Sequence, residues 1–349
     1  MNGTLKSLCY GAVGGLAFFL LDLPLAWMMG SMCLTTVLAL RGMTLQVHDG
    51  LRKVMTAVLG VMLGSSFSPG LFQNLSVWQN GLALLTLNVV LSMIVIYWYY
   101  RKIGGFDPIT AYFSSAPGGF NVMYEVGEAK GGDGRAIALI HATRILFLVM
   151  TVPLAFRYGA DIQSGASELD LIGNWGDLEG YLWLSLAAVV GYVGGGLIRL
   201  PASHLMGPLA VAAIFEITGI TSAKPPMLIV YAAQLVIGTA IGLRFLGTTW
   251  HEIRHIIVLS LGSTVVMMLL AVLLSYFATS FVGVSIPGLI LALSPGGLAE
   301  MSLVALALGI DVAFVSIMHV IRITAIISIV PLAYPTVSKL WDRQKPDPS

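Results

Sequence analysis

The chain has 349 residues, of which 57% are hydrophobic and 10% are charged, and its mean hydropathy is +0.89. Soluble domains are about 45–50% apolar and about 25% charged, so this composition excludes an ordinary soluble enzyme and a disordered protein. The net charge of +1 leaves no basic excess for nucleic-acid binding. The two cysteines, Cys9 and Cys33, lie in apolar runs and form neither a disulfide framework nor a metal-ligand spacing.

Long apolar segments follow one another along the chain, and a spanning helix needs roughly 20 such residues. We predict helices at 8–21, 24–40, 54–72, 80–100, 136–156, 181–198, 202–220, 226–247, 256–280 and 313–334. Pro24 and Pro201 are expected to open the second helix of each close pair, where a missing N–H is tolerated. No A-x-A-like site follows the first run, so we expect that helix to be retained. The predicted fold class is an all-α polytopic membrane protein.

Two Pro-Gly-Gly segments interrupt this pattern. In 107–129, eight helical residues precede the break and ten follow it. Proline removes a backbone donor and glycine has poor helix propensity, so the helix should stop there. Each half is about 12–15 Å long, which places the break near the middle of a bilayer. The halves either cross as one discontinuous helix or turn back as a re-entrant hairpin, because broken backbone at this depth must be surrounded by protein or a water-filled cavity.

The chain contains two copies of one unit at an offset of 178 residues. Ala116-Pro117-Gly118-Gly119 matches Ser294-Pro295-Gly296-Gly297, Asp133 matches Asp311, and His141 and Arg144 match His319 and Arg322. We therefore assign 8–157 to a first membrane repeat, 158–180 to an acidic linker, 181–335 to a second membrane repeat, and 336–349 to a polar cytoplasmic tail.

The basic residues favour one of two topologies. With re-entrant segments and a cytoplasmic N-terminus, each repeat crosses five times, the repeats are inverted, and 14 of the 18 Lys and Arg lie inside against two outside. With crossing segments, 11 lie inside and five outside. The positive-inside rule favours the re-entrant topology, in which the linker lies outside.

The repeated motifs resemble those of a known family. Tandem units with S/A-Pro-Gly-Gly, followed by a helix in which a polar residue precedes an arginine by three positions, resemble the AbrB family of bacterial inner-membrane proteins. The resemblance covers roughly 8–157 and 183–335. Members are often labelled regulators of gene expression or ammonia monooxygenases. The family is also similar to inverted-repeat secondary transporters related to cation antiporters and bile-acid-type symporters, so the resemblance implies that fold and an inner-membrane location.

The paired interruptions point to a binding site, because such breaks in corresponding positions mark the substrate sites of repeat transporters. Helix halves that begin near Gly119 and Gly297 expose N–H groups and a positive dipole end, which suit a carboxylate. We predict a substrate-binding site made of Ser115, Pro117, Gly118, Gly119, Asn121, His141, Arg144, Ser294, Pro295, Gly296, Gly297, Glu300, His319 and Arg322. The alternative for the glycines is close packing between helices.

The two His/Arg pairs share a helix face within each repeat, because their members are three residues apart. Ionisable residues at membrane depth are functional candidates. In one interpretation Arg144 and Arg322 attract an anionic substrate while the histidines hydrogen-bond it or carry a proton. In the other, the arginines donate to carbonyls freed by the Pro-Gly-Gly breaks and hold the fold. The two interpretations are compatible.

Two further sets of charged residues have alternative roles. Glu300 has Val122 as its counterpart, so an acid at this depth predicts either a proton or sodium site, or a pairing with an arginine or exposure at the aqueous mouth. Asp133 and Asp311 open the following helices, where we expect them to act as N-caps.

His251-Glu252-Ile253-Arg254-His255 matches the H-E-x-x-H pattern of zinc proteases. The first repeat has nothing like it and no third ligand stands in a recognisable pattern. We therefore favour a charged interfacial collar, and an intramembrane zinc metalloprotease is the least favoured function.

The pattern as a whole predicts a secondary transporter of a small anionic organic metabolite, working by alternating access, and not an enzyme. A scaffold of 8–72 and 181–247 would move against the segments that carry the tips. No cofactor or metal is expected. The chain has no G-x-x-x-x-G-K-[ST] phosphate loop, so a proton or sodium gradient is the expected driving force. The expected partners are the lipid bilayer and a small-molecule substrate, without nucleic acid, and the sequence is compatible with a homo-oligomer. The expected location is the bacterial inner (plasma) membrane, and the alternative function is a membrane-bound regulator of gene expression acting through a partner.

Overall fold

In the computed structural model the protein is described over residues 2–67, 75–159, 177–248 and 250–342, and every regular element in these ranges is a helix. The first half contains α1 (Asn2–Leu20), α2 (Ala26–Leu40), α3 (Asp49–Gly64), α4 (Leu75–Lys102), α5 (Pro108–Ser115), α6 (Phe120–Ala129) and α7 (Gly134–Gly159). The second half contains α8 (Leu178–Leu197), α9 (Ser203–Ile217), α10 (Met227–Gly242), α11 (Trp250–Val282), α12 (Ile286–Leu293), α13 (Leu298–Ala307) and α14 (Val312–Asp342), with a 3-10 turn at Leu243–Phe245. The seven helices of each half follow one another in the same order and with similar lengths.

Seven of the described helices are long and apolar enough to cross a membrane, namely α1, α4, α7, α8, α10, α11 and α14. The chain is therefore a multi-pass membrane protein, and the predicted all-α polytopic fold class is confirmed. Most of the predicted linker at 158–180 falls on 160–176, which lies outside the described residues. Half of the predicted tail at 336–349 does so too, at 343–349, whereas 336–342 continues α14.

Several helices extend beyond their predicted bounds, as α1 does at its start and α14 at its end, and one helix is displaced at both ends. The apolar pattern placed it at 54–72, whereas α3 begins at Asp49 and ends at Gly64. It begins earlier because Nδ1 of His48 accepts a hydrogen bond from the Gly50 N–H at 3.2 Å, and because an acidic first residue suits the positive helix start. As a result Arg52 lies within the first turns of α3 and not in a preceding loop.

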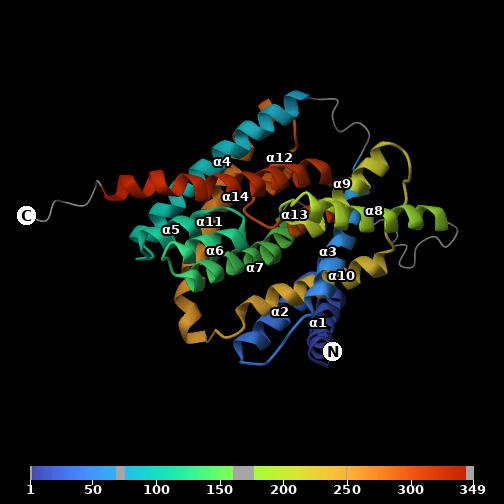
Figure 1. Cartoon of the computed structure of the whole chain (residues 1–349), viewed down its shortest axis with the longest axis horizontal. Coiled ribbons are helices and arrows are strands. Elements are labelled where there is room, and N and C mark those ends of the chain that lie inside the picture. The colour runs from blue at the N-terminus through green and yellow to red at the C-terminus, as the bar shows by residue number, and fades with distance from the viewer. Residues whose placement is uncertain (1, 68–74, 160–176, 249, 343–349) are drawn as a thin grey trace, which may run out of the picture.

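The helices form two groups that Figure 1 shows side by side. We call α1–α3 with α8–α10 the scaffold group, and α4–α7 with α11–α14 the hairpin group. Most helix packing occurs within a group, while α13, α14 and α7 make the main contacts between the groups. The N-terminus lies with the scaffold group and the C-terminal end of α14 with the hairpin group.

Within the scaffold group the two halves pack on each other reciprocally. Helix α3 lies against α9, and its counterpart α10 lies against α2. A Cβ atom on Gly60 would be 2.5 Å from the Leu205 carbonyl oxygen, and one on Gly238 would be 2.4 Å from that of Met28. Glycine is therefore required at both positions, since only a residue without a side chain allows the backbones to come this close.

The turns that join α1 to α2 and α8 to α9 have the same unusual backbone. The non-glycine residues with positive φ in the described chain are Asp22 (52°), Leu25 (49°), Arg199 (53°) and Ala202 (48°). The predicted helix openings at Pro24 and Pro201 are wrong by two residues, because the residue after each proline adopts this left-handed conformation and the helix begins only at Ala26 or Ser203. Such a conformation is strained for residues with a side chain.

Each Pro-Gly-Gly segment forms a helical hairpin. In the first, the Asp133 N–H donates to Oγ1 of Thr110 at 2.7 Å, so the start of α7 lies beside the start of α5. In the second, a Cβ on Gly288 of α12 would be 3.5 Å from Ile310, directly before α14. The arms of eight and ten residues are about 12 and 15 Å long, and in each segment the chain turns back toward the start of its first arm.

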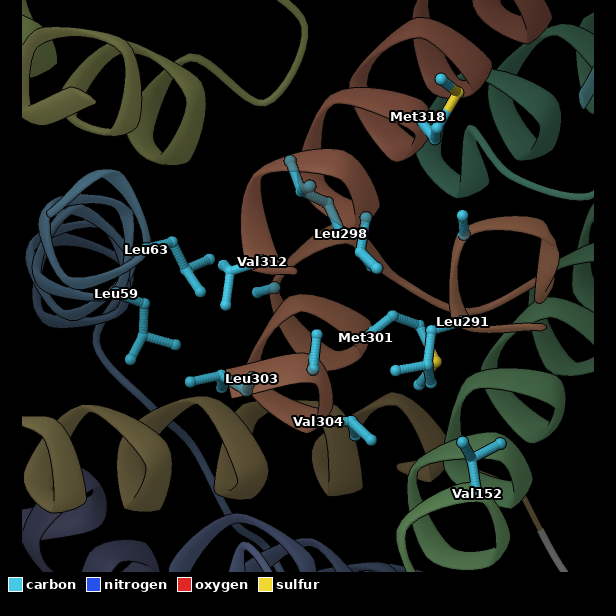
Figure 2. Packing of buried hydrophobic residues seen from close by; sticks show 14 of the residues in the cluster. Leu59, Leu63, Val152, Leu291, Leu298, Met301, Leu303, Val304, Val312 and Met318 are labelled. Carbon is cyan, nitrogen blue, oxygen red and sulfur yellow. The ribbon is translucent and has the colours of Figure 1, made fainter. Parts of the chain in front are cut away.

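The two hairpins have different surroundings. Figure 2 shows Leu59 and Leu63 of α3 directed toward Leu303 of α13 and Val312 of α14, within the largest buried apolar cluster. The first hairpin packs mainly in a smaller cluster, made by residues of α5 to α7 with Ile326 and Val330 of α14. The second hairpin is therefore the one that bears directly on the scaffold group.

Candidate functional site

The two hairpin tips meet in one cavity of about 520 Å³ between the scaffold group and the hairpin group, which we call the tip cavity. Of the predicted site residues, Gly118, Gly119, Asn121, His141, Arg144, Pro295, Gly296, Gly297 and Glu300 line it. The remaining predicted residues, Ser115, Pro117, Ser294, His319 and Arg322, are not part of its wall. The cavity wall thus brings together predicted site residues that are more than 170 positions apart in the sequence.

Arg322 lies behind the second tip and holds it. Its Nη2 donates to the carbonyl oxygen of Gly296 at 2.6 Å, and its Nη1 donates to that of Ser294. The side chain is 1% exposed, and a Cβ on Gly118 of the other tip would be 3.9 Å from its Nε. This is the structural role considered for the arginines, in which the guanidinium replaces donors that the helix break has removed.

Arg144 has a different set of partners, although it occupies the matching position. His141 Nε2 hydrogen-bonds the carbonyl oxygen of Phe113 at 3.1 Å, so Nε2 carries the proton and Nδ1 accepts from Arg144 Nη2 at 2.9 Å. The guanidinium is 2% exposed, its Nε has no hydrogen-bond partner among the described residues, and it lines the tip cavity. A buried cation with free donors at a cavity wall is suited to an anionic ligand.

His319 does not repeat the contacts of His141. Its Nδ1 hydrogen-bonds the Val315 carbonyl oxygen at 2.9 Å on its own helix, and its buried Nε2 has no partner among the described residues. It lies outside the tip cavity, so only the first His/Arg pair reaches that space.

Three arginines line the tip cavity that the sequence pattern did not predict, namely Arg52, Arg199 and Arg244. The Arg244 guanidinium stacks over the Phe120 ring at 4.5 Å, and its Nη1 is buried without a partner among the described residues. The only sequence signal was the position of Arg244, directly after the repeated glycines of α10 and with no acid nearby.

Within the part of the chain that the structure describes, Arg52 is the cavity arginine that forms an ion pair with an acid. Its Nη2 lies 2.6 Å from Asp49 Oδ1, while Lys53 Nζ lies 2.7 Å from the other oxygen. The pKa of this exposed Asp49 carboxyl is lowered to about 2 by the hydrogen bond from Lys53 and then by that from Arg52. The acid therefore stays ionised, and with two bases beside it this corner of the cavity mouth remains positive.

Among the described residues, Glu300 is the only acid in the wall of the tip cavity. Its carboxylate folds back over the start of α13, where a Cβ added to Gly297 would collide with Oε2. The start of α6 carries no such acid, since Val122 occupies the matching position and Gly119 offers no capping side chain. One helix start is thus already occupied by a carboxylate and the other is open.

The tip cavity combines four arginines, one glutamate and the uncapped start of α6. A helix start carries a partial positive charge and free N–H groups, and convergent guanidinium groups in a confined space attract anions. The arrangement can therefore hold a small molecule with one or more carboxylate or phosphate groups.

The capping aspartates behave as predicted. Asp133 Oδ1 accepts from the Ala136 N–H at 2.9 Å, and Asp311 Oδ1 accepts from the N–H groups of Ala313 and Phe314 at 3.0 and 3.1 Å. Both carboxylates are therefore engaged at helix starts, as the repeat predicts.

The H-E-x-x-H segment lies at the start of α11, where the side chains of His251 and Glu252 fall outside the described residues and His255 is exposed. Over the described part of the chain, no group of three or more His, Cys, Asp or Glu side chains could hold a metal ion.

Comparison with known proteins identifies relatives over nearly the whole length. A family model described as "Transition state regulatory protein AbrB" matches residues 27–338. A Bacillus subtilis (strain 168) protein, "Uncharacterized protein YhjN", is 24% identical, and the alignment covers 96% of this chain and 93% of that protein. An Escherichia coli (strain K12) protein, "Putative regulator AbrB", is 25% identical over 95% of this chain and 94% of its own length.

Proposed function

The chain belongs to the AbrB family, and we propose that it is a secondary transporter of a small anionic organic metabolite. The observation that carries this proposal is the tip cavity, in which two interrupted hairpins from opposite halves of the chain meet four arginines and one glutamate. Paired interruptions of this kind mark substrate sites in repeat transporters.

The residues of the cavity divide the work of binding. Arg144, oriented by its hydrogen bond to His141, supplies buried donors to the anionic group. Arg244, which lines the same cavity and stacks on Phe120, supplies a second donor through its Nη1, which has no partner among the described residues. The open start of α6 adds backbone N–H groups, while the mouth arginines draw the anion in.

In the bilayer, we propose that the two hairpins are re-entrant and that the halves are inverted. Five spans per half then place the starts of α3 and α7 inside and the ends of both helices outside, as the 14-to-2 distribution of Lys and Arg favours. Transport would proceed by movement of the hairpin group against the scaffold group, in the inner membrane of a bacterium. No cofactor is needed, and Glu300 is the candidate site for a coupling proton or sodium ion.

The proposal is tested with purified protein. A screen of carboxylate and phosphate metabolites by thermal shift in detergent should find a stabilising ligand, and proteoliposomes should then take up that ligand under an imposed ion gradient. Arg144→Gln should weaken binding by about tenfold or more while the protein still folds, because one charge-assisted hydrogen bond contributes about 1.5–3 kcal/mol.

Arg41→Gln is the matched control, since Arg41 is exposed at the end of α2 and outside the cavity. Unchanged ligand affinity in Arg144→Gln, or no anion bound by the wild-type protein, would contradict the proposed site.

A regulator of gene expression acting through a partner is the second candidate, because the family description contains the word "regulatory" and the name of the Escherichia coli relative contains "regulator". A regulator of this kind would bind the metabolite at the same cavity without moving it. Binding without uptake in proteoliposomes would therefore favour the regulator.

A further inference from the structure

A second cavity of about 330 Å³ lies at the opposite end of the scaffold group from the tip cavity. Helix α3 lines the tip cavity with Thr56 and the second cavity with Met62. Helix α7 does the same with Arg144 and Arg157, which are about 20 Å apart along the helix axis. The two cavities therefore open toward opposite ends of the same helices.

The walls of the two cavities correspond to each other through the repeat. Asp22-Leu23-Pro24-Leu25 lines the second cavity, and the matching turn from Arg199 to Ala202 lines the tip cavity. Both turns have positive φ at their first and last residues. Two further pairs match at the offset of 178 residues. Gln234 of the second cavity corresponds to Thr56 of the tip cavity, and Ser66 of the second cavity corresponds to Arg244 of the tip cavity.

The two cavities differ in what the hairpins contribute. The tip cavity receives both Pro-Gly-Gly tips, whereas the second cavity receives Leu303, Leu306 and Ala307 from the far end of α13. Helix α13 therefore forms part of both walls, with its start in one cavity and its end in the other. In this conformation the scaffold group therefore contributes the same kind of wall to both cavities, but only the tip cavity also contains the Pro-Gly-Gly tips.

An ion pair joins the two groups beside the second cavity. Arg157 Nη2 at the end of α7 lies 2.5 Å from Oδ2 of Asp22 in the strained turn. The tip cavity has no equivalent, because the matching turn residue is Arg199, which makes no ion pair within the described residues. At this end the two groups are thus joined by an ion pair, whereas at the tip-cavity end the described residues join them by the hydrogen bond from Arg135 Nη2 to the Gly247 carbonyl oxygen at 2.7 Å.

We infer that the second cavity is the binding station for the same small organic anion in the opposite conformation, and that the Asp22–Arg157 pair holds it closed in this one. The inference rests on the proposed function and extends it to a second site. Arg157 and Lys224 supply positive charge there, and Trp27 with Tyr231 supplies an aromatic wall, so the anion it accepts carries an apolar part.

The test measures access with thiol reagents in the full chain, after replacement of Cys9 and Cys33. Gln234→Cys reports on the second cavity, because Gln234 is 3% exposed there, and Thr56→Cys reports on the tip cavity. Asp22→Asn removes the ion pair and keeps the turn, since asparagine tolerates positive φ. The probe is 2-sulfonatoethyl methanethiosulfonate, with its trimethylammonio analogue as the cationic comparison.

Asp22→Asn should raise the labelling rate of Gln234→Cys by about threefold, the size expected from loss of an exposed ion pair, and change that of Thr56→Cys little. Exchanging the charges, Asp22→Arg with Arg157→Asp, should restore slow labelling, because arginine already occupies the matching strained position at Arg199. The second quantity is the ratio of the labelling rate of the anionic reagent to that of the cationic one. Once Asp22→Asn has opened the cavity, this ratio should be several-fold higher at Gln234→Cys than at a Leu5→Cys reference, which is exposed on α1.

Unchanged labelling in Asp22→Asn, or no rescue by the exchanged pair, would overturn the closing role of Asp22–Arg157. Opening without anion preference at Gln234→Cys would overturn the second binding station. Loss of anion preference at Thr56→Cys alone would instead reject the proposed function at the tip cavity, so the two failures are distinguishable.

Discussion

Arg322 is bonded through Nη2 to the Gly296 carbonyl oxygen at 2.6 Å, inside the hairpin tip that its own repeat supplies. A helix that stops at Pro-Gly-Gly leaves carbonyl groups without their N–H partners, and buried groups of this kind need a donor. Arg322 supplies it through both Nη atoms, and although its Nε has no partner among the described residues, the side chain lies outside the wall of the tip cavity. Arg144, at the matching position, donates to His141 through Nη2 and weakly to Met267 Sδ through Nη1, while its Nε has no partner among the described residues and the side chain lines the cavity.

Arg322→Gln is therefore expected to destabilise the protein, by about 3 kcal/mol for the loss of two charge-assisted hydrogen bonds in a buried site. The amide of glutamine is shorter and cannot reach both carbonyl oxygens. The measurement is the thermal midpoint in detergent, compared with Arg144→Gln, which should lose much less. A protein with Arg322→Gln that melts like wild type and fails only in ligand binding would return Arg322 to the substrate site.

The sequence predicted the tips and their meeting because both depend on local chemistry and on an exact repeat. Pro-Gly-Gly ends a helix wherever it stands, and one offset of 178 residues joins the two breaks to two His/Arg pairs. The repeat could not predict that Arg144 and Arg322 would take different partners. The two hairpins pack in different surroundings, so matching residues of the two repeats find different hydrogen-bond partners.

The cavity arginines were missed for another reason. Arg52, Arg199 and Arg244 stand at helix ends, where the sequence predicts only charges that face water. Their convergence depends on the crossing of α3 and α10 with α9 and α2, which is set by glycine contacts between distant segments. A single sequence shows the glycines but does not show what they contact.

Gly119→Ala tests whether the first tip approaches the ligand. Gly119 has φ of +67°, and an added Cβ would be 3.1 Å from Ile327 in the cavity wall. Gly105 is the matched control, because its φ is +68° and an added Cβ would meet nothing within 4 Å. Both substitutions should cost about 1–2 kcal/mol of stability from the left-handed backbone, as seen in the thermal midpoint.

Only Gly119→Ala should also weaken anion binding, by about tenfold, because its methyl group would occupy the space in the cavity beside the exposed N–H groups at the start of α6. Equal affinity in the two variants would show that the first tip does not contact the ligand.

The re-entrant topology predicts on which side of the membrane two exposed residues lie. Ala129, the last residue of α6, should face the cytoplasm, and Ser222, between α9 and α10, should face outward. With Cys9 and Cys33 replaced, an impermeant maleimide added to intact cells should label Ser222→Cys at least tenfold faster than Ala129→Cys, and breaking the cells should remove the difference. Fast labelling of Ala129→Cys in intact cells would exclude a hairpin that opens to the cytoplasm.

The reciprocal glycine contacts make a prediction about stability that needs no ligand. Alanine at Gly60 would place its Cβ 2.5 Å from a backbone carbonyl oxygen of α9, and alanine at Gly238 would place it 2.4 Å from one of α2. Backbone cannot move aside as a flexible side chain can, so each substitution should cost about 1–3 kcal/mol, the usual range for overpacking.

Gly194→Ala and Gly196→Ala are the controls, because both lie in α8 with nothing within 4 Å of an added Cβ. These controls should be neutral or slightly stabilising, since alanine has the better helix propensity. Thermal midpoints in detergent should therefore fall together for Gly60→Ala and Gly238→Ala, and a fall in only one of them would show that the two halves do not pack equivalently.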